Sequence, residues 1–200
     1  MTLTDTRPAR PATVSAALVL ALVAATLDVL TVVLGWLTLQ GQLDAIDELI
    51  GSRTRGGSDS DVDAMTSGYV IGVAFSSLVL FAFAASYLIN GMLASAGKQP
   101  ARVLLWVTAG LDLCYFGCST VSSGMPTDAE LSSGGTITGT EVADAIAQAQ
   151  PAWIQLLQVP ATVLWALSLL ILVAVLAAPS SNRYFRPAPA TPAYPPPVGP

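Results

Sequence analysis

Two aspartates lie inside long apolar stretches, and they are the residues of this chain best placed to do chemistry. Asp28 falls within residues 12–39 and Asp112 within residues 103–121, and neither stretch contains Lys, Arg or His. A charged side chain in an apolar membrane interior costs about 2.5–3.5 kcal/mol on insertion scales. Each acid therefore needs a partner, and the chemistry open to such a pair is proton transfer, cation binding or hydrogen bonding between helices.

Both aspartates lie on helical stripes of mainly small and polar residues. Around Asp28, positions spaced alternately three and four apart hold Thr13, Ala17, Ala21, Ala24, Asp28, Thr31, Gly35 and Thr38. The same spacing around Asp112 gives Ala101, Leu105, Thr108, Asp112, Tyr115, Ser119 and Ser122. Small residues let helices approach closely, so both stripes are predicted to face other helices. The two carboxyl groups start from comparable points and fall at similar depth, so we expect them to meet.

With no cationic partner in the apolar stretches, at least one of the two acids should be protonated near neutral pH. It would then donate to the other acid or to a candidate polar site made of Thr31, Asn90, Tyr115 and Gln158. Two interpretations stay open at this point. The favoured one is a set of polar contacts that hold helices together; the alternative is a site that handles protons or cations in a small transporter or channel subunit.

The composition indicates the elements that must position these acids. Of 200 residues, 53% are hydrophobic and only 10% are charged, against about 25% charged in an average soluble domain. A bilayer needs about 20 apolar residues per helix, and the stretches that qualify are residues 12–39, 69–93, 103–121 and 153–177. We therefore predict an all-α integral membrane four-helix bundle. The first stretch is too long for a removable signal peptide and is interrupted by Asp28, so we expect it to be retained.

Several kinds of functional site are excluded. The chain has no histidine, which removes imidazole metal sites and every nucleophile that relies on histidine. Cys114 and Cys118 are interpreted as small packing residues, not as a metal or redox pair. Nucleic acid is not expected as a partner because no basic stripe exists. We predict a protein that is not an enzyme and that has no catalytic residue, metal or cofactor.

The acidic run Asp59, Asp61 and Asp63 resembles the start of a calcium loop. Ala64 and Val70 stand where that loop requires its glycine and its final glutamate. We interpret the run as part of a solvated acidic loop.

The charges predict an orientation. Six of the eight basic residues gather at the same ends of the stretches, namely Arg7, Arg10, Lys98, Arg102, Arg183 and Arg186. Residues 40–68 and 122–152 hold ten of the thirteen acidic residues. By the positive-inside rule, residues 1–11 and 178–200 face the cytoplasm of a plasma membrane, and the two acidic segments are outer loops. Tyr69 and Trp153 begin their spans as interfacial anchors.

A shift of 84 residues places residues 17–28 over residues 101–112 with seven of twelve positions identical. This predicts two helical hairpins related as a parallel repeat, with chance similarity between apolar helices as the alternative.

The outer loops carry local signals as well. Leu43, Ile46, Leu49 and Ile50 predict that the first span continues as a short helix along the outer surface, which stops at Gly51. Thr138 and Glu141 fit a capping box ahead of a further helix. Pro160 predicts a kink near the outer end of the fourth span.

The last fourteen residues contain seven prolines and predict a disordered or polyproline-type tail. A protein partner for this tail or for the outer loops, and a homo-oligomer, are left open.

The layout of the chain, and the junction Ser180-Ser181-Asn182-Arg183-Tyr184-Phe185-Arg186 before Pro187, resemble small four-span membrane proteins common in actinobacteria. That family has Ala/Val/Leu-rich helices and a Pro-rich cytoplasmic tail and is uncharacterised. The resemblance implies a membrane protein without a catalytic motif, and it assigns a role to no residue.

The orientation gives a first prediction. In a variant without Cys114 and Cys118, an impermeant thiol reagent should label a Ser58→Cys protein in intact cells and should not label a Ser181→Cys protein, because only the acidic segments face outward. Labelling of both sites after the membrane is permeabilised is the control. The reverse pattern in intact cells would overturn the orientation.

Overall fold

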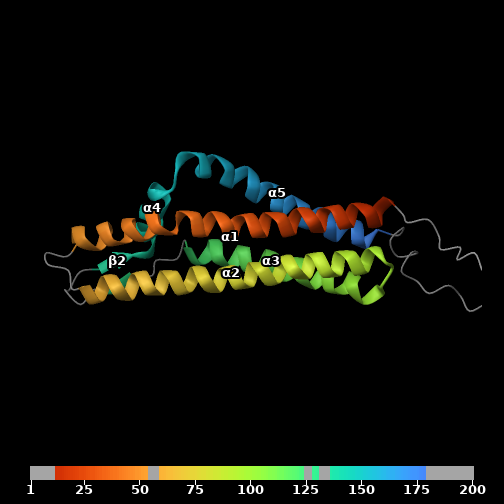
Figure 1. Ribbon diagram of the computed structural model, residues 1–200, viewed down its shortest axis with the longest axis horizontal. Coiled ribbons are helices and arrows are strands. Elements are labelled where there is room, and N and C mark those ends of the chain that lie inside the picture. Colours follow the sequence, from red (N-terminus) through yellow and green to blue (C-terminus); the bar gives the residue numbers. More distant parts are fainter. Residues whose placement is uncertain (1–11, 54–58, 124–127, 131–135, 179–200) are drawn as a thin grey trace, which may run out of the picture.

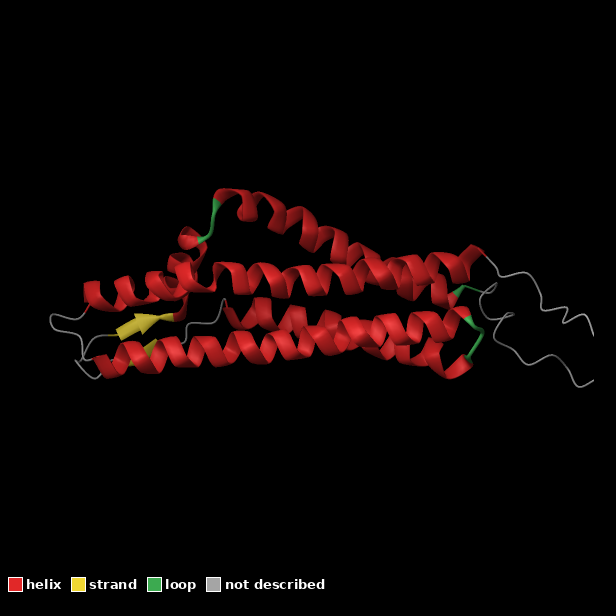
Figure 2. Ribbon diagram, in the orientation of Figure 1, coloured by secondary structure: helices red, strands yellow, loops and turns green. Residues whose placement is uncertain are grey.

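The computed structural model describes residues 12–53, 59–123, 128–130 and 136–178, and within these it is almost entirely helical. Four long helices run back and forth: α1 (Ala12–Arg53), α2 (Asp59–Ser95), α3 (Gln99–Ser123) and α5 (Ala152–Ala177) (Figure 1). Strands β1 (Asp128–Glu130) and β2 (Thr136–Thr138) and helix α4 (Gly139–Ala149) lie between α3 and α5 in the chain (Figure 2). The predicted N-terminal segment and the Pro-rich tail lie outside the described residues.

The four long helices pack in a ring, in which α1 contacts α2 and α5, and α3 contacts the same two helices. Their shared core combines alanines of α1, α2 and α3 with larger side chains, among them Tyr87 of α2, Leu105 of α3, and Trp165, Leu169 and Leu172 of α5. The alanines of α1 bring the helix axes close, and the larger residues of the facing helices fill the space between them.

All four long helices are long and apolar enough to cross a membrane. Their outward faces carry exposed large apolar side chains, including Leu37, Ile71, Leu78 and Leu156. In an ordinary soluble domain most such side chains would be buried instead.

Helices α1 and α2 extend well past the region where all four helices pack (Figure 1). The 42 residues of α1 correspond to about 63 Å, roughly twice the thickness of a hydrocarbon core. Beyond the four-helix region a second cluster contains Ile46 and Ile50 of α1, Ile137 of β2 and, packed on these, Val62, Met65, Tyr69, Val142 and Ile146. We call this part the outer cap, made of residues 40–53, 59–69 and 136–149.

The outer cap corrects three predictions. Residues 43–50 are helical and continue the first span as predicted, but they do not turn to lie along a surface, because α1 runs through them without a break, and Gly51 does not end it. Asp59 to Asp63 are not a loop but the start of α2. The outer segment 40–68 is therefore mostly helical, since Ile46 and Ile50 find a buried partner surface on α4 and β2 and the helix gains packing by continuing.

The capping box at the start of α4 is confirmed. The backbone N–H of Glu141 donates to Thr138 Oγ1 at 3.3 Å, and the backbone N–H of Thr138 donates to Glu141 Oε2 at 3.0 Å. At the other end of the molecule, Gly97 adopts a positive φ of 80° just after α2. Lys98 N–H then donates to the Leu93 carbonyl at 3.1 Å, which closes the helix in a Schellman motif and lets α3 start at once.

The first half of α5 leaves the bundle. Figure 1 shows its start well away from α1 and its end close to α1. Trp153, Leu156 and Val159 are exposed, whereas Leu169, Leu172 and Leu176 are fully buried. Helix α5 continues through Pro160, whose ring nitrogen cannot donate to the carbonyl four residues earlier. Helix α5 therefore turns away from the bundle near Pro160, where one helical hydrogen bond is missing.

Close packing of α1 on α2 gives a second prediction. A Cβ atom added to Gly91 would lie 3.4 Å from both Ala21 Cβ and Leu18 Cδ1, so larger side chains have no room there. Gly91→Leu should lower the free energy of unfolding by about 1–3 kcal/mol, measured by denaturant titration in detergent. Gly72→Leu on the same helix is the control, because a Cβ at Gly72 meets nothing within 4 Å. Equal stabilities of the two variants would contradict the packing.

Candidate functional site

The two aspartates of the apolar stretches lie at the centre of the helix ring. Asp28 on α1 is 2% exposed and Asp112 on α3 is fully buried. Along the helices they lie next to the alanine-rich part of the core, which includes Ala24 and Ala25 on α1 and Ala109 on α3. The small side chains of that region allow α1 and α3 to approach the core closely enough for both carboxyl groups to point inward.

Each carboxyl group accepts a hydrogen bond from an aromatic side chain on another helix. Trp165 of α5 donates its indole N–H to Asp28 Oδ1 at 3.0 Å, and Tyr87 of α2 donates its hydroxyl to Asp112 Oδ2 at 2.9 Å. The first bond ties α1 to α5 and the second ties α2 to α3. Both donors are themselves buried, so neither bond competes with water.

The two carboxyl groups also interact with one another. Asp28 and Asp112 are near enough for direct electrostatic interaction. Asp28, Tyr87, Asp112 and Trp165 form one constellation, to which each of the four long helices contributes one residue.

Two carboxyl oxygens of this constellation have no hydrogen-bond partner among the described residues. They are Asp28 Oδ2 and Asp112 Oδ1, and both are shielded from solvent. A buried polar atom without a partner costs about 1–3 kcal/mol, and more if it carries charge. The site therefore requires something further that can satisfy both oxygens.

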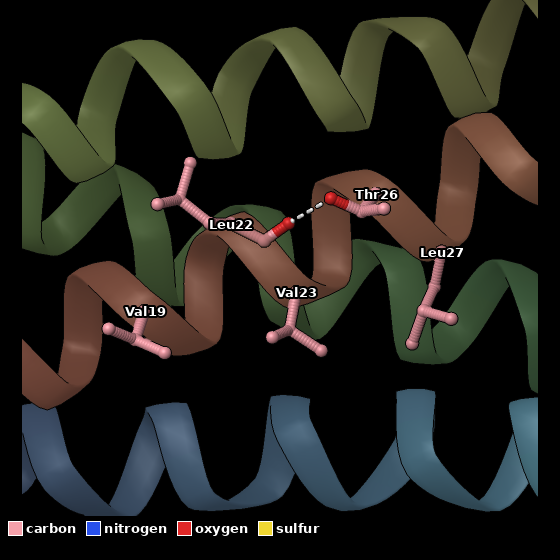
Figure 3. Close-up of a pocket in the computed structure, with 5 residues that line it drawn as sticks. All are labelled: Val19, Leu22, Val23, Thr26 and Leu27. Atoms are coloured by element: carbon pink, nitrogen blue, oxygen red, sulfur yellow. Dashed lines mark hydrogen bonds between the residues drawn. The ribbon is translucent and has the colours of Figure 1, made fainter.

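An aromatic contact covers the site where α5 leaves the bundle. The ring of Phe116 on α3 packs on the Trp165 ring with centroids 4.8 Å apart. An open groove on α1 is lined by Val19, Leu22, Val23, Thr26 and Leu27, and neither acid is among its lining residues (Figure 3). Its one hydroxyl, from Thr26, already donates to the Leu22 carbonyl at 2.8 Å.

The other residues of the predicted polar site lie apart from the acids. Thr31 is exposed and donates to the Leu27 carbonyl of its own helix. The buried face of α1 continues from Asp28 to Val32, four residues on, instead of to Thr31. Gln158 is exposed on the diverging half of α5, and Tyr115 packs edge-on against Phe83 with centroids 6.2 Å apart.

Asn90 belongs to a separate polar cluster between α2 and α3. Its amide donates to the carbonyl and the hydroxyl of Ser86 at 2.9 and 3.0 Å, and the Ser86 hydroxyl bonds that of Thr108 at 2.7 Å. This cluster holds α2 to α3 and satisfies its own polar atoms.

Sequence reasoning missed both aromatic donors. Tyr87 and Trp165 lie inside predicted spans, far from the ends where interfacial aromatic residues are expected. That position was an available signal, because a buried Tyr or Trp usually finds an acceptor for its polar hydrogen.

The cysteines and the acidic cap residues do not build a second site. Cys114 and Cys118 are free and exposed, so they do not pack in the interior as predicted. In the part of the chain that the structure describes, no three His, Cys, Asp or Glu side chains are grouped so that they could hold a metal ion. Comparison with protein-family models, with curated proteins and with solved structures finds no match.

The paired donors give a third prediction. Trp165→Phe keeps an aromatic ring but removes the N–H bonded to Asp28, and Tyr87→Phe removes the hydroxyl bonded to Asp112. Each variant should lose about 1–3 kcal/mol of unfolding free energy, because a buried carboxyl oxygen is left unpaired. Denaturant titration in detergent measures this loss.

The matched controls are Trp153→Phe, at an exposed position, and Tyr115→Phe, because the acids accept their aromatic hydrogen bonds from Tyr87 and Trp165 instead of Tyr115. Both should stay within about 0.5 kcal/mol of the wild type. A Trp165→Phe protein as stable as Trp153→Phe would show that the indole hydrogen bond contributes nothing.

Proposed function

We propose that this chain is a non-enzymatic multi-pass membrane protein that acts as a structural scaffold, with its four long helices crossing a plasma membrane and its outer cap held outside. The observation that carries this proposal is the sealed acid pair. Asp28 and Asp112 are buried, are bonded to neutral donors from the two other helices, and lie away from the groove on α1. Buried acids whose hydrogen bonds join different helices are suited to holding those helices together.

The depth of the pair supports the membrane arrangement. Asp112 lies ten residues after Arg102, or about 15 Å along α3, which is half of a hydrocarbon core of about 30 Å. Arg102 lies over the Trp106 ring at 5.8 Å, a contact well suited to the membrane interface because the charge remains near water. The exposed apolar side chains on the outward helix faces would then contact lipid.

The charge pattern supports the proposed orientation. Lys98 and Arg102 lie at the short turn between α2 and α3, at the same end of the bundle as the start of α1 and the end of α5 (Figure 1). The outer cap at the opposite end carries exposed Asp44, Asp47 and Asp144. Both termini would be cytoplasmic, and a protein partner would meet the acidic cap or the Pro-rich tail.

The alternative function is proton or cation transport through the acid pair, and the two unpartnered carboxyl oxygens favour it. The positions of the remaining polar residues weigh against it. Thr31 and Gln158 are turned away from the acids, and Asn90 bonds to Ser86 in a cluster of its own. No continuous chain of hydrogen bonds leads from the acids to either end of the described bundle.

A fourth prediction separates the two functions. Asp28→Asn keeps the shape and hydrogen bonding of the side chain, so a scaffold should fold as the wild type does, whereas Asp28→Leu should lose about 1 kcal/mol of stability. Vesicles that contain purified protein and a trapped pH dye should take up protons no faster than empty vesicles. Proton uptake by the wild type that Asp28→Asn abolishes without loss of fold would replace the scaffold with a transporter.

A further inference from the structure

We propose that Asp28 and Asp112 form a proton-binding site, in which one proton is shared between Asp28 Oδ2 and Asp112 Oδ1 and Phe116 keeps water away from it. The inference goes beyond the scaffold function, because it assigns a ligand to the site and a number of protons to the folded chain. It starts from the two buried oxygens that have no partner in the described structure.

The number of unpaired carboxyl oxygens indicates that the pair binds one proton. Trp165 and Tyr87 satisfy one oxygen of each carboxyl group, which leaves one oxygen on each side. Without a proton, two negative charges face one another and both oxygens stay unpaired. One proton between them satisfies both, because one carboxyl donates and the other accepts. A second proton would add a hydroxyl with no acceptor of its own.

No charged side chain next to the pair can take the place of the proton. The groups that face it are Asp28 from α1, Tyr87 from α2, Asp112 from α3 and Trp165 from α5, and none of these is cationic. Arg102, the nearest basic residue along α3, lies at the start of that helix over Trp106. A metal ion fits poorly, because it needs about six oxygen ligands and the two aromatic side chains present only hydrogens to the acids.

Phe116 is positioned to exclude water from the shared proton. It lies one helical turn beyond Asp112 on α3, so the two side chains project from the same face. Its ring packs on that of Trp165 with centroids 4.8 Å apart, five residues beyond Pro160 in α5. Removing the ring would open a route for water to the acids from the side where α5 has left the bundle.

The experiment counts protons in the purified full-length protein. Reversible unfolding by denaturing detergent is followed from about pH 6 to pH 8, where an ordinary aspartate is ionised in the unfolded chain. If the folded chain alone retains one proton, the equilibrium constant for unfolding should rise about tenfold per pH unit. Infrared spectra of the folded protein should show the carbonyl band of a protonated carboxyl group.

Three variants test the assignment. Asp112→Asn supplies an amide donor in place of the shared proton, so both the infrared band and the pH dependence should disappear. Phe116→Ala should hydrate the pair and weaken both signals. Phe75→Ala, at an exposed position on α2, should leave both unchanged.

Four results would each overturn the proposal. The first is a wild type without the carboxyl band, and the second is an unfolding constant that is independent of pH. The third is an unfolding constant that changes about a hundredfold per pH unit, which means two protons. The fourth is an unfolding constant that depends on sodium concentration when sodium chloride replaces choline chloride. The wild-type measurements decide the question even if a variant fails to fold. Vesicle proton uptake would overturn the scaffold function and leave this proton count standing.

Discussion

A carboxyl group inside an apolar helix bundle must find neutral donors, and this requirement organises the middle of the molecule. Asp28 and Asp112 are satisfied from opposite sides, by Trp165 of α5 and Tyr87 of α2. Because each bond joins a different pair of helices, losing any one helix would expose a polar group to an apolar environment. Apolar packing alone gives little specificity between helices, so these bonds also fix which faces meet.

A second constraint is the length of α1 and α2. Both are much longer than a hydrocarbon core is thick, and polar side chains join them between the four-helix region and the outer cap. Trp36 donates its indole N–H to Ser77 at 2.9 Å, and the Tyr69 hydroxyl donates to Gln42 at 2.6 Å. Past these bonds the seam becomes apolar again, and Ile46 and Ile50 enter the core of the outer cap. The two cores are therefore separated by a polar stretch of the same helix pair.

Much of this could be predicted from the sequence, because hydropathy and spacing act along one helix. The four apolar helices, the inward direction of both acids and the capping box at Thr138 all depend on residues at most a few turns apart. The donors could not be derived in this way, because Trp165 is 137 residues from Asp28. The internal repeat does not supply them either, since a shift of 84 residues matches Trp165 with Phe81 and Tyr87 with Ile171.

The continuity of α1 links the two ends of the molecule mechanically. A single uninterrupted helix carries Asp28 in the inner core and Ile46 in the outer cap, 18 residues or about 27 Å farther on. A helix of this length transmits tilt like a rod, whereas a flexible loop would absorb it. A load applied to the outer cap would therefore act as torque along α1, opposed first by the bonds of Gln42 to Tyr69 and of Trp36 to Ser77 and then, at the level of Asp28, by the bond to Trp165.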